Sequence, residues 1–99
     1  IQWVPLYDMK EEPDAITLLV DLPGVDEDEI QIGMEAGMAL ISGAREFDHD
    51  NEDAEEYVRV QRPYGAFRLQ IPIPGNVSET LIRAKYRRGV LKVTLPRKR

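Results

Sequence analysis

The chain has 99 residues and a formal net charge of −5, so it is long enough for one domain and too short for two. An acidic balance disfavours a nucleic-acid partner, because phosphate contacts require a basic face. The sequence has no cysteine, no apolar run long enough to span a membrane and no recognisable signal peptide. We therefore expect a single cytoplasmic domain without nucleic-acid or membrane partners. Because it begins at Ile1 rather than Met, we expect a piece of a longer protein.

Hydrophobic and polar residues alternate along much of the chain, with the period of two that is typical of β-strands. The alternation is clearest in five segments, namely residues 16–22, 30–34, 67–71, 82–86 and 90–95. Turn residues separate these segments. Short alternating runs between turns predict an all-β fold, an immunoglobulin-like antiparallel β-sandwich formed by residues 1–99.

Glycine and capping residues indicate where the predicted strands turn. Gly37 and Arg88-Gly89 lie between strand-like runs and predict hairpins. Gly43 lies inside such a run and predicts a β-bulge or a strand end. Asp26 with Glu29, and Ser78 with Glu79, predict two single helical turns.

One segment breaks the alternation, because residues 48–56 contain six Asp and Glu side chains. Such a charge run repels itself and stays solvated, so we expect a long loop here. A calcium loop of the EF-hand type needs Gly at its sixth position and Glu at its twelfth. Counted from Asp48, those positions are occupied by Asp53 and Arg59. We therefore expect no metal site.

No group of residues in the sequence predicts catalysis. His49 is the only histidine, and it lies in the acidic segment, where nothing would hold it in catalytic geometry. The carboxylates fall on predicted loops and solvent-facing positions rather than in a dry pocket. A glycine-rich phosphate loop is also missing. We expect a protein that is not an enzyme and uses no cofactor, so its function must come from binding.

An ordered set of motifs covers nearly the whole chain. It consists of Asp21-Leu22-Pro23-Gly24-Val25, Leu40 to Glu46 (LISGARE), Gly89-Val90-Leu91 and Leu95-Pro96. Together these motifs resemble the alpha-crystallin domain of small heat-shock proteins. The resemblance implies the core of an ATP-independent holdase chaperone, which binds partly unfolded client proteins and prevents their aggregation.

The length of the acidic segment is similar to that of the bacterial and plant type of this domain. In that type, the loop carries a strand that crosses to the partner and pairs with the partner's opening strand. The resemblance therefore implies that residues 46–62 contain a swapped strand and that the chain forms a homodimer. The implied dimer interface consists of Val4, Leu6, Tyr7, Tyr57, Val58, Arg59, Val60, Gln61 and Arg62.

The family also has a groove between two edge strands, which accepts an Ile-x-Ile or Ile-x-Val segment from a C-terminal tail. The matching positions here are Ile30, Ile32, Met34, Ile82, Ala84 and Tyr86. Large apolar side chains at alternate positions fit pockets along a sheet edge. Because the sequence ends at Arg99 without such a tail, we expect a dimer, with higher oligomers only when the terminal arms are present.

A second interpretation is a CS-type co-chaperone or adaptor module, which shares the sandwich fold but docks on one specific partner. The long loop, the strand-like run after it and Gly89-Val90-Leu91 favour the small heat-shock protein. An extracellular immunoglobulin-like domain is disfavoured because the paired cysteines of that class are missing.

Overall fold

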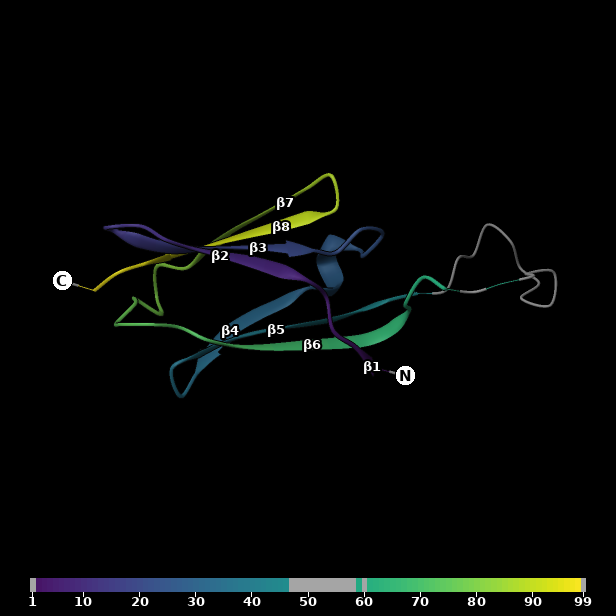
Figure 1. Ribbon diagram of the computed structural model, residues 1–99, viewed down its shortest axis with the longest axis horizontal. Coiled ribbons are helices and arrows are strands. Elements are labelled where there is room, and N and C mark those ends of the chain that lie inside the picture. The colour runs from purple at the N-terminus through teal and green to yellow at the C-terminus, as the bar shows by residue number, and fades with distance from the viewer. Residues whose placement is uncertain (1, 47–58, 60, 99) are drawn as a thin grey trace.

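The computed structural model describes residues 2–46, 59 and 61–98. The described residues form two four-stranded sheets that face each other as a sandwich (Figure 1). Sheet A has the order β1-β6-β5-β4 and sheet B the order β2-β3-β8-β7. The strands of sheet A are β1 (Gln2–Trp3), β6 (Gly65–Pro72), β5 (Met38–Arg45) and β4 (Gln31–Glu35). Those of sheet B are β2 (Tyr7–Glu11), β3 (Ala15–Asp21), β8 (Val90–Pro96) and β7 (Arg83–Arg87).

The interior of the sandwich is lined by the alternating residues that the sequence pattern indicated. Sheet B contributes buried side chains from β3 and β8, and sheet A contributes them from β5 and β6. The central set consists of Ile16, Leu18, Val20, Ile41, Phe67, Leu69, Ile71, Leu91, Val93 and Leu95. Full burial of one such side chain stabilises the fold by about 1.5–3 kcal/mol. The predicted all-β sandwich is therefore confirmed.

Both predicted hairpins are present, and each is a tight turn. Ala36-Gly37 joins β4 to β5 with φ values of 53° and 78°, and Arg88-Gly89 joins β7 to β8 with 52° and 79°. Two consecutive positive φ values are typical of the type I′ turn, whose twist matches that of the flanking strands. Glycine at the second position avoids the strain that a side chain would cause there.

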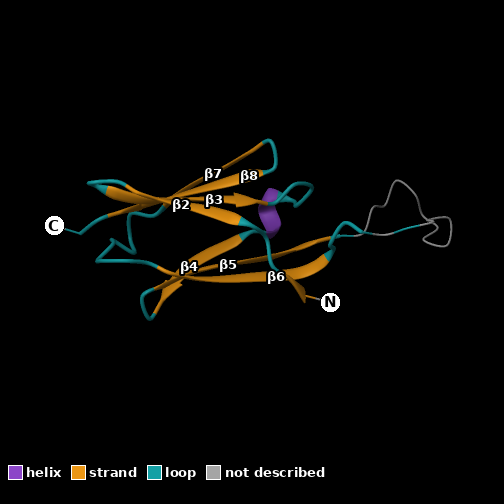
Figure 2. Cartoon of the chain, in the orientation of Figure 1, coloured by secondary structure: helices purple, strands orange, loops and turns teal. Residues whose placement is uncertain are grey.

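The predicted helical turns have different outcomes. Glu27–Glu29 form η1, a 3₁₀ turn, and the Asp26 carboxylate accepts a hydrogen bond from the Asp28 N–H at 3.1 Å. This turn is the only helical element among the described residues (Figure 2). The second prediction, at Ser78 and Glu79, is wrong because residues 79–80 form a turn without a helix. The Ser78 N–H instead donates to the Pro96 carbonyl at 2.7 Å, which ties this segment to the end of β8.

The prediction for Gly43 is also wrong, because this residue lies in regular pairing inside β5, opposite Phe67. Its role is to allow a close approach. A Cβ atom at this position would lie 2.7 Å from the Glu29 carbonyl oxygen and 2.9 Å from the Phe67 ring. Glycine is therefore required by packing rather than by a bulge.

The first strand departs from the antiparallel pattern. β1 pairs with β6 in parallel, with Trp3 opposite Phe67, whereas β2 belongs to sheet B. The chain thus crosses from one sheet to the other at residues 4–6 (Figure 1). This crossing leaves β2 at an edge of sheet B and exposes the short linking segment.

Candidate interaction surfaces

Four of the predicted groove residues lie on two strands that each end a sheet, and Ile30 and Ile82 directly precede these strands. β4 is the last strand of sheet A and β7 the last strand of sheet B, so each leaves one backbone edge without a neighbouring strand among the described residues. Ile30, Ile32 and Met34 are partly buried, and all three pack against the central core. The β4 edge is therefore lined by apolar side chains that pack on the core.

Tyr86 anchors the β7 edge. Its ring packs against the core, and its hydroxyl donates to the Leu22 carbonyl at 2.5 Å. Ile82 is also half-buried against the core, whereas Ala84 between them is exposed. A small exposed residue between two large anchored ones leaves room for another side chain. The six residues named from the resemblance thus lie on or directly before the two edge strands, and the groove between them stays a prediction.

The second predicted surface includes β2, the other edge of sheet B. The Asp21 N–H donates to the Leu6 carbonyl at 3.0 Å, and the Glu12 N–H donates to the Ala15 carbonyl at 2.9 Å. Bonded pairs alternate in an antiparallel ladder, so Asp8 and Lys10 also direct their backbone groups to β3. The intervening residues therefore direct their N–H and C=O groups to the open edge; these are Tyr7, Met9 and Glu11.

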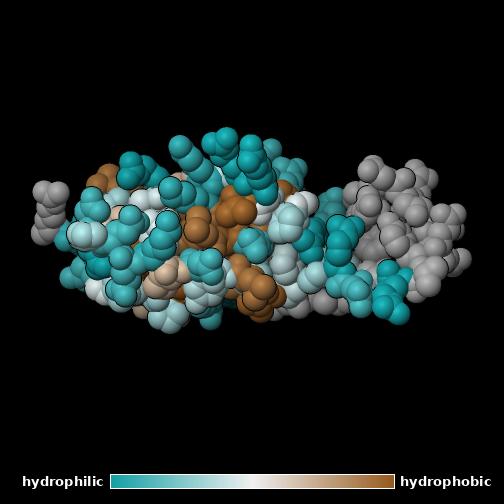
Figure 3. Space-filling model, turned by 45° about the horizontal axis from the view of Figure 1, so that its top comes forward, coloured by the Kyte–Doolittle hydropathy of each residue, from teal (hydrophilic) through white to brown (hydrophobic). Residues whose placement is uncertain are grey.

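Large apolar side chains are exposed beside this open edge. The exposed fractions are 70% for Val4, 78% for Leu6 and 40% for Tyr7. The space-filling view shows apolar surface in the middle of the face that it presents, bordered by polar residues (Figure 3). Exposed apolar side chains next to an open strand edge mark a surface suited to another polypeptide.

The remaining residues of the predicted dimer interface are only partly described. Tyr57, Val58 and Val60 lie outside the described residues, so the swapped strand stays a prediction. Arg59, Gln61 and Arg62 are exposed, and none of them belongs to a strand of this single chain.

A cluster around Arg45 was not anticipated from the sequence. This side chain is 8% exposed; its Nη1 donates to the Pro23 carbonyl at 2.8 Å and its Nε donates to the Pro63 carbonyl at 2.7 Å. The Nη2 atom also donates to Pro63. The Trp3 Nε1–H donates to the Gly65 carbonyl at 2.9 Å. Arg45 and Pro63 thus flank residues 46–62, so this cluster holds together the two ends of the predicted swap segment.

Arg45 is the one residue in the cluster whose titration is perturbed. Burial lowers the pKa of Arg45 below its ordinary value, and the positive charge of Arg62 lowers it further, whereas Tyr86 acts in the opposite direction. Guanidinium remains charged in proteins at neutral pH. A buried charge of this kind needs partners, which the two carbonyls and the Trp3 ring provide. The LISGARE motif contained this arginine, but nothing in its spacing indicated the partners.

Other kinds of site receive no support from the described part of the chain. Within it, no three His, Cys, Asp or Glu side chains come close enough together to hold a metal ion. Nor does it contain a helix of the length and apolarity that crossing a membrane demands.

Comparison with known families agrees with this architecture. The Hsp20/alpha crystallin family matches residues 8–99. The chain belongs to this family. The resemblance inferred from the motifs is thereby confirmed.

The similar curated proteins are heat shock and spore proteins. The chain is 37% identical over 91 residues to the 17.7 kDa class II heat shock protein of Arabidopsis thaliana, covering 91% of this chain and 58% of that protein. It is 32% identical over 96 residues to spore protein SP21 of Stigmatella aurantiaca, covering 97% of this chain and 56% of that protein. The chain therefore spans somewhat more than half the length of these relatives.

Solved structures match over the full sandwich. HspA from Xanthomonas axonopodis superimposes with a TM-score of 0.89 at 36% identity, covering 99% of this chain and 97% of that one. A small heat-shock protein from Xylella fastidiosa superimposes with a TM-score of 0.87 at 34% identity, covering 100% of this chain and 90% of that one. The latter structure is described as having a distinct high order structure.

Proposed function

We propose that this chain is the core of an ATP-independent holdase, which binds partly unfolded proteins and keeps them from aggregating. The observation that carries the proposal is a family domain whose edge strands β4, β7 and β2 have apolar side chains beside them. An extended polypeptide can add to such an edge through backbone hydrogen bonds while its side chains enter alternate pockets. Neither surface requires a nucleotide or a chemical step.

Light scattering of a heated client protein tests the holdase proposal. The full-length protein is expected to suppress aggregation equally with and without ATP. A protein that gives no protection, or protection that depends on ATP hydrolysis, would contradict the proposal. The 99-residue chain assayed beside it measures how much of the activity belongs to the core.

We propose further that two chains form a homodimer in which residues 57–62 of one chain pair with the β2 edge of the other. The outward backbone groups of Tyr7, Met9 and Glu11 support this arrangement, as do the exposed side chains of Val4 and Leu6. Strand addition would cover an edge that otherwise invites aggregation, and exchange of equivalent segments is a common route to dimers.

Two exposed leucines allow a matched test of the dimer by analytical ultracentrifugation. Leu6→Lys places a charge beside the β2 edge, and we expect it to weaken dimerisation by about tenfold or more. Leu81 is 61% exposed and lies beside the 13–15 turn, at the opposite end of sheet B from Leu6, so Leu81→Lys should leave the dimer intact. A wild-type chain that is monomeric at micromolar concentration would refute the dimer.

The third part of the proposal is that the β4–β7 groove binds an Ile-x-Ile segment of a chaperone tail or a client. The supporting observation is exposed Ala84 between the anchored side chains of Ile82 and Tyr86. Ala84→Trp would fill this space without disturbing the core. We expect it to weaken binding of an Ile-x-Ile peptide by about tenfold in fluorescence anisotropy, whereas Lys85→Trp on the opposite face should not. Equal effects of the two variants would place the peptide elsewhere.

A further inference from the structure

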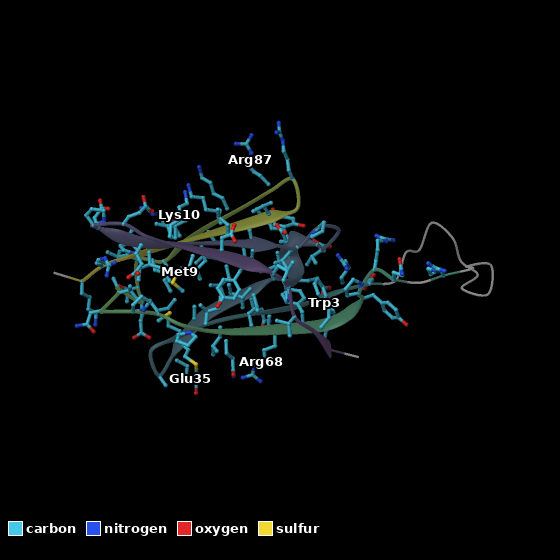
Figure 4. The ribbon with its side chains drawn as sticks, viewed as in Figure 1. Trp3, Met9, Lys10, Glu35, Arg68 and Arg87 are labelled. Carbon is cyan, nitrogen blue, oxygen red and sulfur yellow. The ribbon has the colours of Figure 1, made fainter. Side chains whose placement is uncertain are left out.

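The outer face of sheet B carries a concentration of positive charge that the proposed function does not use. Strand register places Lys10 and Arg83 at opposite ends of one row across the sheet, with Thr17 and Thr94 between them. The other cations of this face are Lys85 and Arg87 on β7 and Lys92 on β8. All five side chains are exposed. Figure 4 shows Lys10 and Arg87 pointing away from the sandwich.

Positively charged side chains outnumber negatively charged ones on this basic face. Lys85 and Lys92 lie directly opposite each other on neighbouring strands, an arrangement of like charges that is destabilising. The acidic side chains on this face are those of Asp8 and Asp21, which lie on the same rows as the cations, and of Glu12, whose carboxylate accepts a hydrogen bond from the Thr17 hydroxyl at 2.7 Å. Among the described residues, none of the five cations forms a salt bridge. Neighbouring strands are about 4.8 Å apart and successive residues along a strand about 3.3 Å apart, so the five cations occupy a region about 20 Å across.

The sequence contains one anionic segment of matching charge. Residues 48–56 carry six of the 18 acidic residues, and without them and the terminal Arg99 the chain has 12 basic and 12 acidic residues. The entire negative excess therefore belongs to this one segment. By contrast, residues 80–99, which include β7 and β8, contain no Asp or Glu. The basic face also lacks the exposed aromatic side chains on which nucleic-acid bases stack.

We propose that the basic face of one chain binds the acidic segment 48–56 of a second copy. This inference rests on the proposed dimer. If residues 57–62 of the partner pair with β2, the partner's preceding residues emerge beside the strand that carries Lys10. Arg45 and Pro63 hold the ends of the same segment beside β5 and β6 of sheet A, on the other side of its own sandwich. The basic face of one chain and the acidic segment of the other are thus brought together in the dimer, where their opposite charges steer and strengthen association.

Charge exchange tests the inference in the dimer. We expect Lys85→Glu with Lys92→Glu, and separately Asp53→Lys with Glu55→Lys, each to weaken dimerisation by about tenfold at low salt. Combining the two pairs should restore the affinity to within about threefold of wild type, because opposite charges again face each other. The control pair Arg68→Glu with Lys98→Glu changes the net charge equally, outside the basic face, and should have no such effect. Losses that add in the combined variant would overturn the inference.

A peptide assay separates this inference from the dimer itself. The Leu6→Lys variant, expected to be monomeric, should bind a synthetic peptide of residues 46–57 at low salt. An isosteric peptide with Asn and Gln in place of Asp and Glu should not bind. Adding Lys85→Glu with Lys92→Glu should raise the dissociation constant by at least about tenfold. No binding of the acidic peptide, or tighter binding of duplex DNA or phosphatidylserine vesicles, would overturn the assignment whatever the oligomeric state.

Discussion

The Cζ atom of Arg45 lies 4.5 Å from the centre of the Trp3 ring, so a residue at the end of β5 holds the first strand of the chain. Trp3 also packs against Phe67, with ring centroids 5.3 Å apart. The Arg45 guanidinium also donates hydrogen bonds to the carbonyls of Pro23 and Pro63, which connects both residues to the Trp3–Phe67 pair. The start of the chain, the turn after β3 and the ends of segment 46–62 therefore depend on one side chain.

Replacement of Arg45 should destabilise the fold. Arg45→Ala removes charge-assisted hydrogen bonds to two carbonyls and a cation–π contact, and we expect a loss of about 3 kcal/mol in the free energy of unfolding. Arg45→Lys should lose somewhat less, because one ammonium group cannot reproduce the fork of donors. Trp3 is the only tryptophan, so its fluorescence during urea denaturation reports directly on this cluster.

Arg68 offers the control for this measurement. It lies on the neighbouring strand β6, is exposed on the outer face of sheet A and points away from the sandwich (Figure 4). Arg68→Ala should change the free energy of unfolding by less than about 0.5 kcal/mol. Comparable losses for both arginines would show that the Arg45 contacts contribute little.

Glycine at position 43 is a packing requirement, and Gly43→Ala should be costly. The added methyl group would meet the Glu29 carbonyl and the Phe67 ring at less than 3 Å, so we expect a loss of about 1–3 kcal/mol in denaturant unfolding. Gly33→Ala is the matched control, because a Cβ there meets nothing within 4 Å and the glycine has no positive φ. That variant should be neutral or slightly stabilising, and an equal loss in both would exclude the steric explanation.

The hydroxyl of Tyr86 should contribute to stability as well as to the groove. Tyr86→Phe leaves the Leu22 carbonyl without this donor, and we expect a loss of about 1–2 kcal/mol, measured by thermal and urea unfolding. Tyr7→Phe removes a hydroxyl from an exposed ring and should have no effect on unfolding of the monomeric Leu6→Lys background. If Tyr86→Phe were equally neutral, the bond to Leu22 would not be a stabilising contact.

The neighbours Arg68 and Leu69 test how strictly the alternation along β6 determines which side chains face the core. Leu69 is 3% exposed in the core, so Leu69→Arg buries a charge without a partner and should destabilise by more than about 4 kcal/mol. Arg68→Leu lies on the outer face and should leave the melting temperature nearly unchanged. A folded Leu69→Arg variant with near-normal stability, seen by circular dichroism, would show that β6 can shift its register.

Much of the fold was predictable because its physical origin is local. Alternation placed Leu91, Val93 and Leu95 on one face, and glycines between strand-like runs indicated both tight hairpins. The groove positions came from the family resemblance, and binding there stays a prediction. Two local predictions failed. One is the helical turn at Ser78 and Glu79, and the other is Gly43, whose necessity arises from a carbonyl and a ring contributed by distant residues.

The sequence by itself determined which residues face the core, where the hairpins turn and to which family the chain belongs, because these follow from neighbouring residues and ordered motifs. Only the tertiary structure decided that β1 and β2 belong to different sheets, that Arg45 joins Trp3 to Pro63, and that the basic residues share one face. Each of these depends on how the two sheets stack and which strands become edges. Such pairings join residues far apart in the chain, so no local pattern records them.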